Sequence, residues 1–366
     1  MRGQPRWAAA GETEKMDYRR MGASDLEVSA IGFGCWELGG TYYGPIDEAQ
    51  AVAAIHRAMD LGVTLFDTAP GYGFGHSEEL LGRALGARRK DVVLVSKTAI
   101  SWDPVTFTRK LDSRYSTVKR IAEEGLRRLG TDHLDLLLIH WPDVETPLEE
   151  TMRALTDLVD EGKTRHAGVS NFTAYELREC RRHAPICANQ VGYNLFDRRW
   201  EREMFPTAQE LGIGVMAYGP MAHGLLTGAM GRATAFDPQD WRASGMIFGQ
   251  HLFGPQNLPR NLEVVEQLQA VAARLGATLP RLALAWVLRH PAVSVALSGC
   301  RTPGEIEENV RALEVTIPAE VAGELERIMG GAAGQVETVP GQHHLPGVPR
   351  GVGVITGTLP ARRHQP

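Results

Sequence analysis

Asp67 and Tyr72 place a carboxylate and a phenol five positions apart in the chain. An apolar stretch, 63–66, runs directly into Asp67, and a turn rich in Gly and Pro leads on to Tyr72. A phenol can donate a proton and a carboxylate can hold a cation beside it, so the pair suits acid–base chemistry. The same two residue types also occur in ordinary turns, where Asp caps and Tyr packs. The pair alone leaves a structural role and a catalytic role both open.

Polar residues close the other apolar stretches as well. In chain order the series is Asp67, Lys97, His140, Ser170 with Asn171, Gln190, Tyr218 and Arg301. One such residue alone is usually a solvated strand end or a satisfied core group. A series of them at successive strand ends is typical of a site built where parallel strands terminate.

The chemistry of these groups favours acid catalysis on a carbonyl. A buried Lys97 beside Tyr72 would favour the phenolate and lower the phenol pKa from its usual value of about 10. Asp67 is the nearest partner for the ammonium group of Lys97, and His140 can orient a carbonyl oxygen. The sequence has no Gly-x-Ser-x-Gly elbow and no cluster with metal-ligand spacing. A cofactor that supplies the reducing equivalents fits this inventory best, with no metal.

The elements that must position these residues alternate regularly between apolar strands and amphipathic helices. The expected strands are 30–33, 63–66, 92–96, 134–139, 165–169, 188–191, 214–217 and 294–297. Continuous apolar strands separated by helices indicate a parallel sheet that is buried on both faces. Eight such units predict an α/β fold, a closed (β/α)8 TIM barrel. An open doubly wound sheet is the alternative, disfavoured because Gly32-Phe33-Gly34 lacks the third glycine of a dinucleotide-binding turn.

Three segments are expected along the chain. Residues 1–15 form an N-terminal arm, residues 16–330 form the barrel, and residues 331–366 form a flexible tail that contains seven glycines and five prolines. The tail either drapes over the barrel mouth or is free, and it is expected to be free beyond about Gly341. A short β-hairpin, 18–20 with 26–28, precedes the barrel. A long loop, 228–259, follows the seventh strand, and loops of this length in a compact domain are usually functional.

Composition excludes several partners. The 366 residues carry 39 − 44 = −5 net charges, so nucleic acid is not an expected partner. No apolar run approaches the roughly 20 residues that span a bilayer, and the N-terminus lacks the apolar core of a secretory signal. The cysteines are Cys35, Cys180, Cys187 and Cys300, without paired spacing. A reduced, cytoplasmic setting is expected, and the oligomeric state is left open.

The chain resembles the aldo-keto reductase superfamily from about residue 18 to residue 329. The matching motifs are Phe66-Asp67-Thr68-Ala69-Pro70-Gly71-Tyr72-Gly73, Ser96-Lys97-Thr98, Leu138-Ile139-His140-Trp141-Pro142, Gly168-Val169-Ser170-Asn171-Phe172, Asn189-Gln190-Val191-Gly192-Tyr193-Asn194 and Ser298-Gly299-Cys300-Arg301-Thr302 with Glu308-Asn309. The resemblance implies a catalytic tetrad of Asp67, Tyr72, Lys97 and His140, with Tyr72 as the proton donor.

The same resemblance implies a nicotinamide cofactor. Ser170, Asn171 and Gln190 would hold its carboxamide, Tyr218 would stack on its ring, and Arg301 and Asn309 would hold its adenosine end. The other implied cofactor contacts are Gly34, Trp36, Gly219, Pro220, Gly224 and Glu305. The position of Arg301 before a helix N-terminus also suits an anion on physical grounds.

The sequence departs from the family pattern at three positions. Gly219 stands where the family often has a serine, Ser298 where it usually has a proline, and Glu305 where a glutamine often faces the adenosine. A carboxylate at Glu305 would repel a 2′-phosphate or pair with Arg301. The resemblance still favours NADP(H) over NAD(H).

The expected activity is the NADPH-dependent reduction of an aldehyde or ketone. Trp36, Phe74, Trp141 and residues of the loop 228–259 are candidate walls of a small-molecule pocket, which leaves sugars, keto-steroids, aromatic aldehydes and small ketones open. Two alternatives are an NAD-dependent dehydrogenase of a sugar or secondary alcohol that uses the same site, and a cofactor-binding regulatory or scaffold protein.

Overall fold

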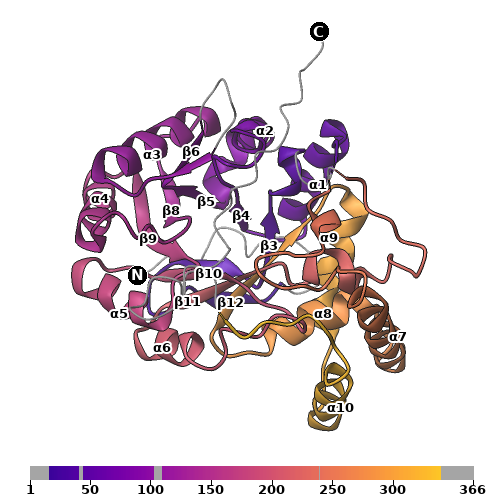
Figure 1. Ribbon diagram of the computed structural model, residues 1–366. Helices are drawn as coiled ribbons and strands as arrows, with labels where there is room; N and C mark the ends of the chain where they lie inside the picture. Colours follow the sequence, from indigo (N-terminus) through magenta and orange to yellow (C-terminus); the bar gives the residue numbers. More distant parts are fainter. Residues whose placement is uncertain (1–15, 41–43, 103–108, 239, 339–366) are drawn as a thin grey trace, which may run out of the picture.

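Eight parallel strands close into a barrel in the computed structural model of the chain (Figure 1), which describes residues 16–40, 44–102, 109–238 and 240–338. The barrel strands in spatial order are β3 (Ile31–Gly34), β4 (Leu65–Asp67), β5 (Val93–Thr98), β8 (Leu134–Ile139), β9 (Thr164–Ser170), β10 (Ala188–Gly192), β11 (Gly214–Tyr218) and β12 (Val293–Gly299). β12 pairs with β3 and closes the ring. The TIM-barrel prediction is confirmed, and the open sheet is excluded.

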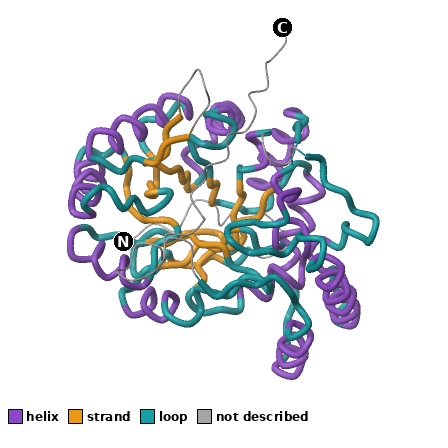
Figure 2. Tube along the Cα trace, in the orientation of Figure 1, coloured by secondary structure: helices purple, strands orange, loops and turns teal. Residues whose placement is uncertain are grey.

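Helices surround the strands, which lie at the centre of Figure 2. They are α1 (Glu48–Asp60), α2 (His76–Leu85), α3 (Tyr115–Leu129), α4 (Leu148–Asp160), α5 (Ala174–His183), α6 (Met204–Glu210), α7 (Leu258–Arg274), α8 (Leu279–Leu288), α9 (Pro303–Val310) and α10 (Ala319–Met329). Most barrel helices bury one apolar face, whereas α8 is buried almost all round. In α1, for example, the buried residues Ala51, Ala54, Ile55 and Ala58 recur at helical spacing. The strands, covered by helices outside and side chains inside, are buried on both faces.

The N-terminal hairpin closes the end of the barrel opposite the strand carboxyl ends. It consists of β1 (Tyr18–Arg20) paired antiparallel with β2 (Glu27–Ser29), as the sequence predicts. Met21 and Val28 of this hairpin are fully buried and pack in one cluster with inward-facing barrel residues such as Leu136 and Met216. The barrel interior is therefore a packed core, and the hairpin covers the end opposite the carboxyl ends of the strands.

A strand pair and a helix were not anticipated from the sequence. β6 (Ile100–Trp102) and β7 (Arg109–Leu111) form an antiparallel pair after β5. Helix α10 follows the eighth strand–helix unit and packs against α7. Its residues 319–329 lie within the predicted barrel segment.

The predicted tail begins against the barrel, which is one of the two arrangements that the sequence leaves open for it. Residues 331–338 are bound to the barrel: Gly334 O accepts a hydrogen bond from His251 N at 2.7 Å, and Ala333 N donates to Asn261 Oδ1 at 2.8 Å. Val336 N donates to Gln250 Oε1 at 2.7 Å. On the side of residues 331–338 these hydrogen bonds are made by backbone groups, and amino-acid composition does not reveal backbone contacts. The predicted arm 1–15 and the rest of the tail, 339–366, lie outside the described residues.

Within the described ranges, no single helix has both the length and the apolarity needed to cross a bilayer, although α7 and α8, bent by 86° at their junction, pass that test as a pair.

Candidate active site

The four predicted catalytic residues meet at the carboxyl end of the barrel. Lys97 Nζ, at the end of β5, donates to Asp67 Oδ1 at 2.6 Å and to Tyr72 Oη at 3.2 Å. A third bond from Nζ, 2.9 Å long, goes to the carbonyl oxygen of Thr68. The His140 ring lies edge-on to the Tyr72 ring, with 5.9 Å between centroids. These contacts place a phenol, an ammonium group and an imidazole around one small volume.

Burial dominates the acid–base properties of the tetrad. The side chain of Lys97 is fully buried and that of Asp67 is 4% exposed. Burial lowers the pKa of Lys97 and raises the pKa of Asp67, and the contact between the two groups opposes both shifts. Asp67 therefore helps to keep Lys97 charged, as the sequence suggests. Burial also holds the pKa of His140 well below its usual value, so its imidazole is neutral.

The pKa of Tyr72 differs from the sequence-based expectation. Burial raises the pKa of this phenol well above 10, and the carboxylates of Asp67 and Glu37 add to the rise. The charge of Lys97 does not outweigh them, because that charge is shared with Asp67 at shorter range. Tyr72 therefore stays protonated at working pH. It can still protonate an alkoxide, which is a stronger base than a phenolate.

The residues expected to hold a nicotinamide carboxamide form one connected network. Asn171, in a left-handed conformation with φ 65°, donates through Nδ2 to Ser170 Oγ at 3.0 Å and accepts at Oδ1 from Tyr218 Oη at 2.9 Å. Gln190 Nε2 donates to Asp67 Oδ2 at 2.7 Å. The network therefore holds the second oxygen of the tetrad carboxylate, a contact that the sequence does not predict.

The far end of the site lies at the N-terminus of α9. Thr302 and Glu305 form a capping box there. The Glu305 carboxylate accepts hydrogen bonds from the backbone nitrogens of Arg301, at 2.6 Å, and Thr302, at 3.3 Å. Asn309 Nδ2 donates to Ser298 Oγ at 2.8 Å. Glu305 thus offers negative charge to N–H groups that an anion would otherwise use.

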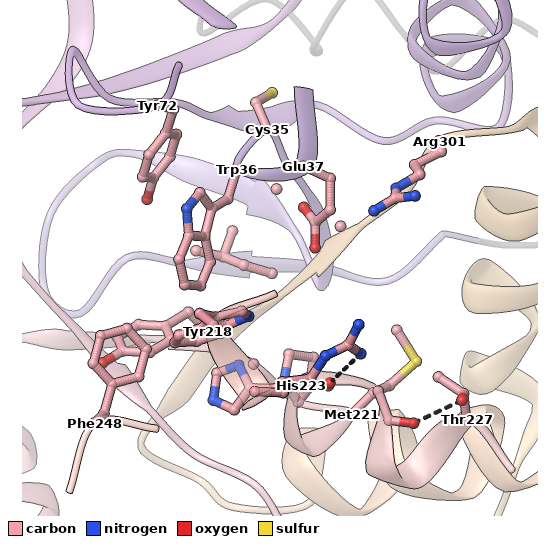
Figure 3. A pocket seen from close by; sticks show the side chains of 18 of the residues that line it. Cys35, Trp36, Glu37, Tyr72, Tyr218, Met221, His223, Thr227, Phe248 and Arg301 are labelled. Atoms are coloured by element: carbon pink, nitrogen blue, oxygen red, sulfur yellow. Dashed lines mark hydrogen bonds between the residues drawn. The ribbon is translucent and has the colours of Figure 1, made fainter. Parts of the chain in front are cut away.

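One cavity of about 1050 Å³ joins the tetrad to the N-terminus of α9. The predicted site residues that line it are Gly34, Trp36, Asp67, Tyr72, His140, Trp141, Ser170, Asn171, Gln190, Tyr218, Gly219, Pro220, Gly224, Arg301, Glu305 and Asn309. Lys97 lies behind Tyr72, without exposed side-chain surface. Side chains from separate strand ends therefore share a single space, part of which Figure 3 shows.

Phe74 does not belong to the cavity wall, contrary to the prediction. Its φ is 54°, and its ring packs edge-on against Trp102 at 5.9 Å, with the guanidinium carbon of Arg109 5.4 Å from its centroid. The left-handed turn after Gly73 directs the ring towards the β6–β7 pair. Arg109 itself lines the cavity and donates to Gly71 O at 2.7 Å, a role that the sequence did not indicate.

The loop after β11 supplies an aromatic wall, as its length suggests. Phe248 lies 5.4 Å from both Tyr218 and Trp241 and 5.9 Å from Trp141, measured between ring centroids. Trp36 stacks on Tyr72 at 6.0 Å. Phe253 of the same loop is instead buried in the core, 4% exposed. The substrate end of the cavity is thus bounded largely by rings.

The titratable cavity residues that the sequence reasoning missed include His223 and Glu37, besides Arg109. His223 lies beneath the aromatic wall, and burial lowers its pKa to about 3. Glu37, in the 3-10 turn Glu37–Gly39 directly after β3, points into the cavity near Arg301 (Figure 3). The signal for Glu37 was its position three residues after Gly34 at the end of a barrel strand. Among the described residues there is no group of His, Cys, Asp and Glu that could hold a metal ion.

The chain belongs to the aldo/keto reductase family, because the family model matches residues 30–329. It is therefore an oxidoreductase of a family that reduces carbonyl groups with NAD(P)H. Membership of this enzyme family disfavours the alternative of a cofactor-binding regulatory or scaffold protein.

Four relatives illustrate the range of the family. Aldo-keto reductase YhdN of Bacillus subtilis is 39% identical over 80% of this chain and 87% of its own length. The NADH-specific methylglyoxal reductase of Escherichia coli is 33% identical over 84% and 98%. Among solved structures, a glycerol dehydrogenase from Gluconobacter oxydans has a TM-score of 0.79 at 34% identity, covering 88% of this chain and 97% of that one. An aldo-keto reductase from Bacillus halodurans has a TM-score of 0.73 at 28% identity, covering 90% and 100%.

The residues present fit a dinucleotide cofactor. The cavity connects the tetrad continuously with the start of α9, so one elongated ligand can reach both. A Cβ atom added at Gly304, in the first turn of α9, would meet nothing within 4 Å, so this turn is open to a ligand. His140 Nδ1 is buried without a hydrogen-bond partner among the described residues. The imidazole beside Tyr72 therefore has a ring nitrogen left to bond to a ligand.

Proposed function

We propose that this protein reduces small aldehydes and ketones to alcohols, with Tyr72 as the proton donor. When bound, the nicotinamide cofactor supplies the hydride. The observation that carries the proposal is the contact of Tyr72 Oη with Lys97 Nζ at 3.2 Å, at the wall of the cavity and beside a neutral His140. These groups surround the place that a carbonyl oxygen would occupy.

Each tetrad residue has a distinct role in this proposal. Tyr72 gives its proton to the carbonyl oxygen as negative charge develops there, and Lys97 stabilises the phenolate that is left. Asp67 keeps Lys97 charged and is itself held by Gln190. His140, whose imidazole is neutral, orients the carbonyl oxygen through a hydrogen bond. The aromatic wall excludes water from the reacting groups.

For the cofactor we propose that NADH is used at least as well as NADPH. Arg301, the residue that would meet a 2′-phosphate, has the Glu305 carboxylate on its own backbone nitrogen at 2.6 Å. This negative charge reduces the local attraction for a further dianionic phosphate. The NADH specificity of the relative from Escherichia coli is in keeping with this choice.

For the substrate we propose small aldehydes, including 2-oxoaldehydes and aromatic aldehydes. Rings of Trp36, Trp141 and Phe248 favour a compact or planar substrate over a large polyhydroxy one. We keep the reduced, cytoplasmic setting as part of the proposal, since the four cysteines are unpaired and buried. Reversal of the reaction, as a secondary alcohol dehydrogenase, uses the same groups in reverse order.

The test measures turnover of a panel of aldehydes with NADH and with NADPH, and the loss of cofactor absorbance reports the turnover. Tyr72→Phe removes only the hydroxyl and is expected to abolish most turnover while leaving cofactor affinity unchanged. Tyr193→Phe is the matched control, because Tyr193 is a buried tyrosine that donates to Glu201 at 2.6 Å away from the cavity. Wild-type turnover by Tyr72→Phe would contradict the proposed proton donor.

A further inference from the structure

The carboxylate of Glu37 occupies the middle of the cofactor cavity. Its side chain leaves the 3-10 turn after β3 and crosses to the end of β12. A Cβ atom placed on Gly299 would lie 2.0 to 2.1 Å from the carboxylate carbon and oxygens of Glu37, so this carboxylate rests directly on the backbone there. Both residues line the cavity, with Trp36 on the tetrad side and Arg301 on the α9 side (Figure 3).

A dinucleotide that reaches from the tetrad to α9 must pass Glu37. Its nicotinamide end belongs beside Tyr72, and its adenosine end belongs beside Arg301. The pyrophosphate between them carries negative charge, and it would have to share the central part of the cavity with an acidic side chain. Like charges in a partly desolvated space repel strongly, unless one of them is neutralised.

The groups around Glu37 make it easy to protonate. Burial is the largest influence and raises the pKa of Glu37 to about 7. Arg301, from the loop before α9, opposes the rise, and Glu305, from α9 itself, adds to it. The other titratable neighbours, Tyr72 and Cys35, have pKa values raised well above their usual range and are neutral. So is Cys300, whose pKa burial also raises.

We propose that Glu37 takes up a proton from solvent when the dinucleotide binds, so that cofactor affinity weakens as pH rises through neutrality. The inference rests on the proposed function, because it requires a nicotinamide dinucleotide along this cavity. The bound state keeps the O–H bond on the Glu37 carboxyl group, whereas the free state loses that proton across the neutral range. Linkage then weakens binding about tenfold between about pH 6 and pH 8.

The first experiment measures NADH binding to the full-length protein by calorimetry, in two buffers that differ in ionisation enthalpy. NADH is the probe because a 2′-phosphate titrates itself, near a pKa of about 6. We expect uptake of about half a proton per NADH at pH 7, and a dissociation constant about ten times larger at pH 8 than at pH 6. This measurement needs no variant and no turnover.

Two variants locate the effect. Glu37→Gln keeps the shape of the side chain and is expected to bind NADH without proton uptake, with an affinity at pH 8 close to that of the wild type at pH 6. Glu305→Gln removes a charge that raises the pKa of Glu37, so it should move the midpoint of the affinity profile to lower pH while keeping its slope.

The opposite sign of pH dependence would overturn the inference. Affinity that strengthens with pH and is lost in Glu37→Gln would make Glu37 an ionised acceptor for a cofactor hydroxyl. NADH binding that is tight but independent of pH would also refute proton uptake, while leaving the proposed reductase function intact. Failure of both NADH and NADPH to bind at any pH would refute the proposed function, and this inference with it.

Discussion

The substitution Asp67→Asn tests whether a counter-charge keeps Lys97 active. Asparagine keeps the volume of the side chain and one acceptor oxygen, but it leaves the fully buried Lys97 ammonium group without its carboxylate at 2.6 Å. Removing one partner of a buried ion pair costs about 3–5 kcal/mol of stability. Lys97 can avoid part of this cost by losing its proton, since burial already lowers its pKa.

The loss of that charge slows proton transfer by an amount that can be estimated. Lys97 Nζ lies 3.2 Å from the Tyr72 oxygen that becomes a phenolate. A unit charge at that distance, with an effective dielectric constant of about 20, contributes about 5 kcal/mol. If half of this is lost, the proton-transfer step slows roughly a hundredfold. We expect kcat to fall by about that factor at pH 7, with a smaller change in cofactor affinity.

The stability of the variant should depend on pH in a defined direction. A lysine whose folded pKa lies below its unfolded value of about 10.4 binds fewer protons when folded, so stability rises with pH between those two values. Losing Asp67 lowers the folded pKa of Lys97 further, so the rise begins at lower pH than in the wild type, with a slope of up to about 1.4 kcal/mol per pH unit. Urea unfolding between pH 7 and pH 10 measures it.

Glu78→Gln is the matched control. Glu78 is a fully buried carboxylate of α2 that pairs with Arg128 at 2.6 Å and lies outside the cavity. Its loss should also destabilise the fold, but an arginine stays charged, so no comparable rise of stability with pH should appear. The role assigned to Asp67 would be refuted by two results together. Asp67→Asn would turn over at a near-wild-type rate at pH 7, and its stability would depend on pH in the same way as that of Glu78→Gln.

Two further substitutions test other parts of the molecule. Arg199→Met removes a hydrogen bond of 3.0 Å that the buried guanidinium donates to the carbonyl oxygen of Phe248. It should raise KM for aldehydes several-fold with little change in kcat. Arg178→Met, which breaks an exposed ion pair, is the kinetic control. Gly22→Ala would place a Cβ 2.2 Å from Gly212 O, at a φ of 58°. It should lower the free energy of unfolding, measured with urea, by roughly 2–4 kcal/mol. Cofactor affinity at the barrel mouth should stay unchanged.

The positions of the site residues were predictable because a parallel barrel brings all strand carboxyl ends to one mouth. Asp67, Lys97 and Ser170 could be placed together once each was recognised as the end of a strand, and they are indeed the last or next-to-last residues of β4, β5 and β9. Periodicity decides this placement, and no knowledge of side-chain packing is needed.

The properties of the same residues could not be predicted, because they depend on burial and on competition between neighbours. The sequence suggests that Lys97 lowers the pKa of Tyr72, yet burial and Asp67 raise it. The contact between Gln190 and Asp67 joins residues 123 positions apart in the chain. Strand register alone does not predict that their side chains come within hydrogen-bonding distance. For Glu37, the position three residues after Gly34 indicates only that it lies near a strand end. Its contact with Gly299 depends on packing and could not be predicted.

The aromatic wall shows how the C-terminal segment contributes to the cavity despite its composition. Phe248 lies at the tip of a tight turn with a φ of 47°, a conformation that costs a bulky residue of the order of 1–3 kcal/mol. Such a conformation persists only when surrounding contacts impose it. Gln250, after the turn, donates through Nε2 to Val336 O at 3.1 Å and accepts at Oε1 from Val336 N at 2.7 Å.

Arg199 completes these contacts. One of its nitrogens donates to both Phe248 O and Thr338 O, each at 3.0 Å, while Asp197 holds the guanidinium from the other side. Residues 331–338 therefore help to keep the Phe248 ring against Tyr218. Because these bonds involve main-chain groups, a segment rich in Gly can make them as well as any other. Removal of residues 331–338 should thus loosen the cavity wall before it unfolds the barrel, whose eight strands close without them.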